Sequence, residues 1–170
     1  LETDRLIISL WQEDDEFYAY ALFGNPTIAS YFTLCRFASY EINKIVRIEK
    51  DSFRRNNYCL FPVFTKDKLA FVGICGLRMF KGEFQFVIIF MPHQWHKGYG
   101  QEVSKKIIDY AFHVLHVPRL IAARCVDDKF SEYIYEKMGF KQIRNCFRSP
   151  NDRPYCAYLL NVIDFEKNQE

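Results

Sequence analysis

The chain has 170 residues, of which 49% are hydrophobic and 26% charged, a composition typical of one globular domain over residues 1–170 and not of a disordered or fibrous chain. A formal net charge of +2, with no run of more than two basic residues, argues against a nucleic-acid partner. Six cysteines without a Cys-x-x-Cys pair, no signal peptide and no apolar run of membrane-spanning length predict a reduced, cytoplasmic protein without a membrane partner.

The first half of the chain predicts one strand, a group of helices and then three strands. Apolar residues over Arg5–Trp11 predict a short first strand. Helical spacing and stop signals predict helices over Glu16–Phe23, Thr27–Phe32 and Tyr40–Arg55. β-Branched and aromatic runs separated by short polar turns then predict an antiparallel meander of Tyr58–Thr65, Ala70–Met79 and Glu83–Met91.

The second half alternates helices with strands. A helix is expected over Tyr99–Leu115, and a second over Lys129–Lys137 that ends at a left-handed Gly139. Strands are expected over Arg119–Val126, Phe140–Phe147 and Tyr155–Ile163. The order therefore predicts an α/β (α+β) fold with one mixed sheet of seven strands, mostly antiparallel and flanked by helices.

The segment between the third strand of the meander and the next helix has the pattern of a phosphate site. An apolar run stops at Pro92, a basic turn with two glycines follows, and helical spacing begins near Tyr99. Such a turn exposes backbone N–H groups beside the partial positive charge of a helix N-terminus. The pattern predicts a phosphorylated ligand at Trp95–Gln101, and a purely structural turn is the alternative. Walker and dinucleotide motifs are absent, since Val103 stands where a third glycine would fall.

Several segments resemble one protein family. Trp95–Gly100 is similar to the (Gln/Arg/Trp)-x-x-Gly-x-(Gly/Ala) loop of the GNAT superfamily of N-acetyltransferases, which holds the pyrophosphate of coenzyme A. Leu1–Ile8 and Asn25–Ile28 resemble the opening of the branch that includes the ribosomal-protein alanine N-acetyltransferases. Asp128–Ser131 and Tyr135–Phe140 resemble two late landmarks of the same branch.

The resemblance implies a fold that opens between the fourth and fifth strands and an enzyme that moves acetyl from acetyl-CoA directly to a primary amine. That amine would belong to a protein N-terminus or to a small molecule, and the enzyme would be a monomer or a homodimer. The cofactor-binding residues that it implies are Ile89, Phe90, Met91, Trp95, His96, Lys97, Gly98, Tyr99, Gly100, Gln101, Asp128 and Ser131.

Two residues are candidates for moving protons. Tyr135 matches the tyrosine that many family members use to protonate the departing thiolate, and its alternative role is packing against Phe140. The family's acidic position on the fourth strand holds Gln85, which cannot act as a base. Glu83, two residues earlier on the same face, can replace it through water or can be a solvated hairpin residue.

Asp128 stands where the family usually has an asparagine, so it brings a negative charge near the cofactor unless it faces solvent. Ser131 is expected near the cofactor or, alternatively, at the helix N-terminus bonding to backbone. The resemblance places the amine acceptor between two loops and the fourth strand, with the candidates Tyr31, Phe32, Gln85, Arg148 and Arg153.

Two other readings stay open. A non-catalytic acyl-CoA-binding or sensing domain of the same fold is favoured by Gln85 and Asp128, and a nucleotide-binding domain would use the same turn for a different phosphate. No metal is expected, because neither the His93/His96 pair nor the other spaced histidines have a carboxylate or cysteine at ligand spacing.

Overall fold

The structure is a computed structural model and describes residues 1–31, 39–148 and 154–168. Its strands are β1 (Leu6–Ile8), β2 (Leu60–Thr65), β3 (Phe71–Phe80), β4 (Glu83–Phe90), β5 (Arg119–Cys125), β6 (Lys141–Arg148) and β7 (Pro154–Asn161). Its α-helices are α1 (Glu16–Phe23), α2 (Pro26–Tyr31), α3 (Ser39–Asn56), α4 (Tyr99–Asp109), α5 (Lys129–Met138) and α6 (Val162–Lys167). A 3-10 turn, η1 (Pro92–Gln94), precedes α4, and a π-helical turn, η2 (Tyr110–Val114), follows it.

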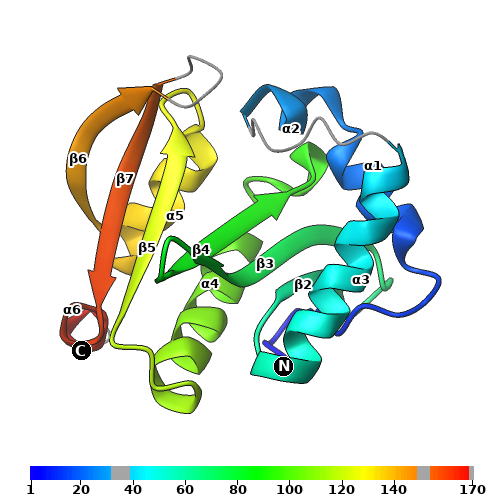
Figure 1. Ribbon diagram of the computed structural model, residues 1–170, viewed down its shortest axis with the longest axis horizontal. Coiled ribbons are helices and arrows are strands. Elements are labelled where there is room, and N and C mark those ends of the chain that lie inside the picture. Colours follow the sequence, from blue (N-terminus) through cyan, green and yellow to red (C-terminus); the bar gives the residue numbers. More distant parts are fainter. Residues whose placement is uncertain (32–38, 149–153, 169–170) are drawn as a thin grey trace.

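All seven strands form one sheet in the order β1-β2-β3-β4-β5-β7-β6. Strands β1 to β4 pair antiparallel, as do β5, β7 and β6, and only β4 and β5 run parallel. A single bridge, Gln85 to Ile121, joins β4 to β5, and beyond it the two strands diverge toward the edge where α2 lies (Figure 1). The predicted fold class, including the opening between the fourth and fifth strands, is confirmed.

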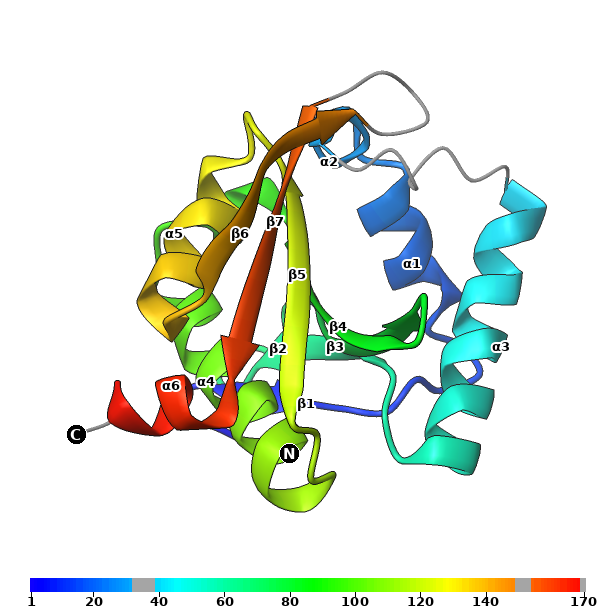
Figure 2. The same cartoon turned by 60° about the vertical axis from the view of Figure 1, so that its left-hand side comes forward.

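Helices cover both faces of the sheet, and β4 contributes to both cores. Phe86 and Ile88 pack with residues of α4 and α5, such as Ile107, on one face. Val87 and Ile89 pack with residues of α1 and α3 on the other (Figure 2). Successive side chains of a strand point to opposite faces, so a strand buried on both sides reads as a continuous apolar run. This burial fixes the position of β4, whose outer edge forms one wall of the opening.

Three elements differ from the sequence expectation. The first strand is only Leu6–Ile8, because the chain then turns so that Trp11 Nε1 donates to the Leu60 carbonyl oxygen (2.6 Å). The last strand ends at Asn161, and the residues after it form α6, which packs Phe165 against Phe112. The long predicted helix is α for Tyr99–Asp109 and π over its last turn, where the Leu115 N–H donates to the Tyr110 carbonyl oxygen (3.1 Å).

Three general findings bear on the class of protein. Within the described ranges, no helix is both long enough and apolar enough to cross a bilayer. Four cysteines, Cys59, Cys75, Cys125 and Cys156, are buried and form no disulfide bond within the described residues. Across the same residues, no group of three histidine, cysteine or acidic side chains is arranged to hold a metal ion.

Candidate functional site

The opening between β4 and β5 exposes a strand edge with unpaired backbone groups. The Met91 N–H donates to the Val72 carbonyl oxygen on the β3 side (2.9 Å). Because consecutive residues of a strand turn their backbone groups to opposite edges, the N–H groups of Met91 and Ile89 face β3, and those of Phe90 and Ile88 face the opening. Of the three strand residues predicted to contact a cofactor, Phe90 is thus the one whose N–H is directed into the opening.

The glycine turn after β4 ends at an uncapped helix N-terminus. Gly98 adopts a left-handed conformation (φ 79°) at the N-cap position of α4, and no side chain caps that helix. The first N–H groups of a helix have no partner within it. The amides of Tyr99, Gly100 and Gln101 are therefore donors at the positive end of the helix dipole, as an anion site requires.

Arg5 anchors this turn to the start of the chain. Its Nη1 donates to the Lys97 carbonyl oxygen (3.0 Å), and its Nε donates to Glu102 Oε2 (2.7 Å). The guanidinium group also lies over the Tyr99 ring, 4.8 Å from its centre. The sequence analysis did not identify this role, because the contact joins residues more than ninety positions apart.

A groove of about 520 Å³ lies between the N-terminal ends of α4 and α5. Its lining residues are Trp95, His96, Gly98, Gln101, Asp127, Asp128, Lys129, Phe130, Tyr133 and Ile134. The two helices approach closely at Gly100, where a side-chain Cβ would come within 2.7 Å of Ile134 Cδ1. The groove thus brings most of the predicted phosphate loop together with Asp128.

Aromatic contacts and one polar contact fix the walls of the groove. The Trp95 ring stacks on Phe130 with ring centres 5.6 Å apart, and its Nε1 donates to the Phe90 carbonyl oxygen (2.9 Å). Gln101 Nε2 donates to the Tyr133 hydroxyl group (2.6 Å). Trp95 therefore links the open end of β4 to α5, and Phe130 and Tyr133 are site residues that the sequence analysis missed.

Asp128, Ser131 and Tyr135 form one stripe along α5. Asp128 is the N-cap residue, and its Oδ1 accepts the Ser131 N–H (3.0 Å). All three side chains are buried. The Ser131 hydroxyl group has no partner among the described residues at the distance and angle of a normal hydrogen bond. An unsatisfied buried hydroxyl costs about 1–3 kcal/mol. A ligand that bonded to the Ser131 hydroxyl group would remove this cost.

Tyr135 lies beneath the junction of β4 and β5. Its ring packs edge-on against Phe86 of β4 and Tyr158 of β7, and its hydroxyl group donates a long hydrogen bond to the Ala123 carbonyl oxygen (3.4 Å). Burial raises the pKa of Tyr135 well above its usual value, and the negative charge of Asp128 raises it further. Tyr135 therefore carries a protonated hydroxyl group near the point where β4 and β5 begin to diverge.

Arg124 supports the stripe from β5. Its guanidinium group is buried and donates to the Tyr158 hydroxyl group (2.9 Å) and the Val126 carbonyl oxygen (2.8 Å). It also forms an ion pair with Glu132. A buried guanidinium group needs such partners, and this set fixes the turn that leads from β5 into Asp128.

Glu83 lies at the start of β4, where it forms a two-point ion pair with Arg119 at the start of β5. The hydrogen bond to Arg119 lowers the pKa of Glu83. A strand rises about 3.3 Å per residue, so Glu83 is roughly 23 Å from Phe90. The ion pair clamps the closed end of the two strands.

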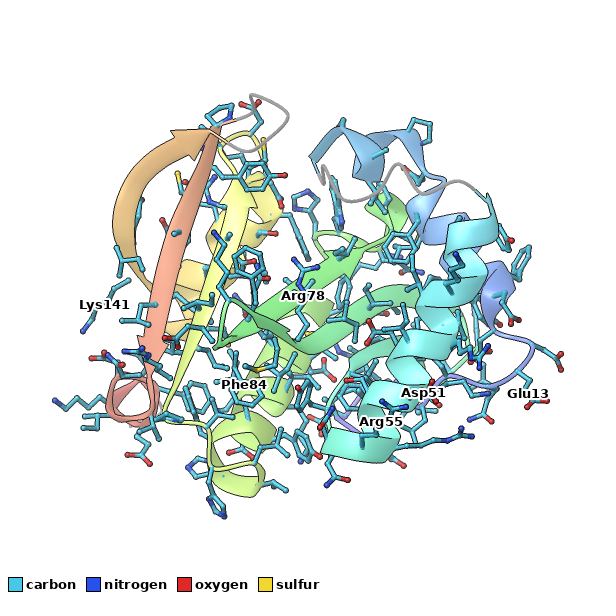
Figure 3. All side chains as sticks on the ribbon, in the orientation of Figure 1. Glu13, Asp51, Arg55, Arg78, Phe84 and Lys141 are labelled. Atoms are coloured by element: carbon cyan, nitrogen blue, oxygen red, sulfur yellow. The ribbon has the colours of Figure 1, made fainter. Side chains whose placement is uncertain are left out.

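Gln85 points to the α3 face of the sheet, where it bonds to Arg78, and Arg78 in turn interacts with Glu49. Gln85 Oε1 accepts from Arg78 Nε (2.9 Å), and Figure 3 shows Arg78 near the middle of the molecule. The carboxylate of Glu49 on α3 accepts the Leu60 N–H (2.6 Å). Burial, the largest cause, raises the pKa of Glu49 to about 7, although the Leu60 N–H and Arg78 lower it. Glu49 has no sequence signal, because only the packing of α3 on the sheet buries it.

The remaining acceptor candidates are described only in part. Phe32 and Arg153 lie outside the described residues, and the same holds for the side chains of Tyr31 and Arg148. The backbone places Tyr31 at the end of α2 and Arg148 at the end of β6. Both ends are at the edge toward which β4 and β5 diverge (Figure 1).

Comparison with known proteins assigns this arrangement to a family. The profile of the family "Acetyltransferase (GNAT) domain" matches residues 5–141, so the chain belongs to the GNAT acetyltransferase family. Among named relatives, the uncharacterised N-acetyltransferase YoaA of Bacillus subtilis is 24% identical over 171 residues, covering 96% of each chain. YnaD of the same organism, also an uncharacterised N-acetyltransferase, is 23% identical over 174 residues, covering 99% of each.

Solved structures of several acetyltransferases share the fold. A GNAT acetyltransferase of Bacillus anthracis superposes with a TM-score of 0.82 at 19% identity, covering 100% of this chain and 99% of that one. The spermidine N-acetyltransferase of Vibrio cholerae, solved in complex with CoA and spermine, gives 0.76 at 17% identity, with 95% and 98% covered. A protein of Vibrio cholerae described as a ribosomal-protein-serine acetyltransferase gives 0.74 at 16%, with 94% and 95% covered.

Proposed function

We propose that residues 1–170 act as one catalytic domain that transfers acetyl from acetyl-CoA directly to a primary amine. The observation that supports this most is the geometry of β4 and β5, which share one bridge and then diverge next to a groove at two helix N-termini. A phosphorylated, elongated thioester fits this combination. We also propose a cytoplasmic location, which the buried cysteines without disulfide bonds in the described ranges support.

The residues present suit this cofactor. The uncapped amides of α4 and the exposed His96 and Lys97 would hold the diphosphate. The open edge at Ile88 and Phe90 would hold the pantetheine arm, and the buried Ser131 hydroxyl group would bond to it. Acetyl-CoA itself supplies an acetyl group activated as a thioester.

The proposed chemistry uses Tyr135 and the open strand edge. Tyr135 would give its proton to the departing sulfur, and the N–H of Ile88 or Phe90 would bond to the developing negative charge on the thioester oxygen. Such a donor lowers the barrier by roughly 3–4 kcal/mol. The amine would lose its proton to water in the acceptor cleft, which is easier for an α-amino group (pKa about 8) than for a lysine-like amine (about 10.4).

Glu83 is assigned a structural role in this proposal. Its ion pair with Arg119 and its lowered pKa make it a weak base, and its position at the closed end is far from Phe90. The acceptor would enter between α2, the end of β6 and the start of β7. Protein N-termini and polyamines are the amines to test first, because similar folds include a ribosomal-protein-serine acetyltransferase and a spermidine N-acetyltransferase.

A thiol-release assay tests the proposal. Purified protein with acetyl-CoA and a panel of peptides, polyamines and small amines should release free thiol only when an accepted amine is present. Tyr135→Phe should lower kcat about a hundredfold with little loss of stability, and Glu83→Gln should change it less than about twofold. Equal turnover by Tyr135→Phe would exclude the acid role, and a hundredfold loss in Glu83→Gln would restore Glu83 as the base.

A non-catalytic acyl-CoA-binding domain is the second candidate. Two observations favour it. Gln85, hydrogen-bonded to Arg78, occupies the position where the family usually has an acid, and Tyr135 is buried. Tight binding of acetyl-CoA without thiol release across the whole panel would support this candidate.

A further inference from the structure

The groove at the two helix N-termini contains a buried carboxyl group that its proposed ligand should disfavour. We propose that Asp128 takes up a proton when the phosphorylated cofactor binds, and that its neutral carboxyl group then donates a hydrogen bond into the groove. This inference rests on the proposed function, because it needs an anionic ligand at this site. It explains how a buried aspartate can line the same groove as the uncapped amides of α4.

The two helices that flank the groove differ at their N-termini. Helix α4 has no side-chain cap, so its first amides are available to an anion. Helix α5 is capped by Asp128, whose Oδ1 accepts the Ser131 N–H (3.0 Å). Asp128 is only 3% exposed and lines the groove. An anion bound at α4 would therefore lie close to a carboxylate that is already largely removed from water.

The groups that face Asp128 compensate its charge only in part. Burial, the largest cause, raises the pKa of Asp128, whereas the Ser131 hydroxyl and amide groups and the charge of Arg124 lower it. Arg124 is shared, because its guanidinium group also forms an ion pair with Glu132. From further along α5, the neutral Tyr135 faces Asp128.

The groove itself brings four more titratable side chains, among them Tyr133 of α5, whose hydroxyl group accepts from Gln101 Nε2. His96 comes from the turn before α4, and Asp127 and Lys129 flank Asp128 in sequence. Lys129 is directed to Glu132, with 2.8 Å between its Nζ and Glu132 Oε2. The nearby cations are thus largely paired, and a bound diphosphate would add negative charge and exclude the remaining water. Both changes favour the neutral form of Asp128.

The neutral form also solves a donor problem. A carboxylate only accepts hydrogen bonds, whereas a protonated carboxyl group donates one and still accepts another. Neutral Asp128 can keep the Ser131 N–H and direct its own O–H to an oxygen of the ligand. The buried Ser131 hydroxyl group, which has no partner at normal hydrogen-bond distance and angle within the described residues, lies beside Asp128 and offers a second donor.

Proton uptake makes cofactor affinity depend on pH in a defined direction. Between the pKa of Asp128 in the free protein and its higher pKa in the complex, binding takes up protons, so affinity falls as pH rises. The fall approaches tenfold per pH unit within that window. Asp128→Asn removes the titrating group and supplies an amide donor of the same shape, and asparagine caps helices as well as aspartate does.

Calorimetry of CoA binding in buffers with different ionisation enthalpies measures the uptake directly. Dephospho-CoA is the better probe, because the phosphate monoester of CoA titrates near pH 6 on its own. We expect uptake approaching one proton per ligand at a pH inside the window, and none beyond the background in Asp128→Asn. That variant should bind more tightly than the native protein above the window, with a flatter pH profile.

Asp127→Asn is the matched control, since Asp127 lines the same groove and carries the same charge but is exposed. It should keep the proton uptake. Equal uptake in Asp128→Asn and the native protein, or weaker binding by Asp128→Asn at every pH, would overturn the inference. Failure of all three proteins to bind either ligand would instead reject the proposed function.

Discussion

At the scale of single residues, Glu49 on α3 is a carboxyl group whose pKa rises from 4.5 to about 7, mainly because it is buried. Its carboxylate also accepts the Leu60 N–H at the start of β2 (2.6 Å). Below pH 4.5 the group is protonated in both the folded and the unfolded chain. Between pH 4.5 and 7 the folded chain holds a proton that the unfolded chain has lost, so the free energy of unfolding falls as pH rises.

Glu49→Gln should remove this dependence while keeping an acceptor for the Leu60 N–H. The variant should match the native protein near pH 4.5 and exceed its free energy of unfolding by up to about 3 kcal/mol above pH 7, from a pKa change of roughly 2.5 units. Urea denaturation at pH 5 and pH 8 measures the difference. Asp51→Asn, at a half-buried position of the same helix where the carboxylate pairs with Arg54, should shift stability by less than about 0.5 kcal/mol at both pH values. A constant gap between Glu49→Gln and the native protein would show that Glu49 does not titrate in this range.

At the scale of elements, two glycines with similar backbone conformations allow an effect on stability to be distinguished from an effect on CoA binding. Gly98 (φ 79°) opens α4, and Gly82 (φ 83°) turns the β3–β4 hairpin. Added Cβ atoms would meet only the Arg5 Nη2 atom at 3.2 Å for Gly98 and nothing within 4 Å for Gly82. Left-handed backbone, and not lack of space, is thus what both positions require of their residue.

Alanine at either position should cost about 1 kcal/mol of stability, since both must hold a left-handed conformation. Only Gly98→Ala should also weaken CoA binding, by about tenfold or more, because it shifts the first amides of α4. Thermal denaturation and calorimetry on the two variants give both numbers. Equal CoA affinity for Gly98→Ala and Gly82→Ala would place the diphosphate elsewhere.

The same elements show what the sequence could predict. The order of strands and helices and the turn Trp95–Gly100 follow from local patterns, namely periodicity, glycine and proline. The helix α6 was missed because Val162 and Ile163 continue the apolar run of β7, whereas the contacts of α6, Phe165 with Phe112 and Asp164 with Lys141, join segments far apart in the sequence. Pairings between distant segments, such as Arg5 with Glu102, leave no local pattern.

At the scale of the whole molecule, the opening divides the sheet into two parts. Strands β1 to β4 form one part, and β5, β7 and β6 form the other. The Gln85–Ile121 bridge and the Glu83–Arg119 ion pair join them at the closed end. Helices α4 and α5 join them on one face, where Gly100 allows close contact with Ile134. A ligand in the opening would therefore complete a sheet that the chain alone leaves incomplete.

Hydrogen exchange of individual amides on β4 can test this view. The N–H groups of Ile88 and Phe90 face the opening and should exchange quickly in the free protein, whereas those of Ile89 and Met91 face β3 and should already be protected. Saturating CoA at a hundred times Kd should slow exchange at Ile88 and Phe90 by up to about a hundredfold, because exchange then requires release of the ligand. Ile89 and Met91 serve as internal controls and should change far less. Uniform protection along β4, or protection confined to Ile89 and Met91, would mean that the ligand does not bind along the open edge of β4.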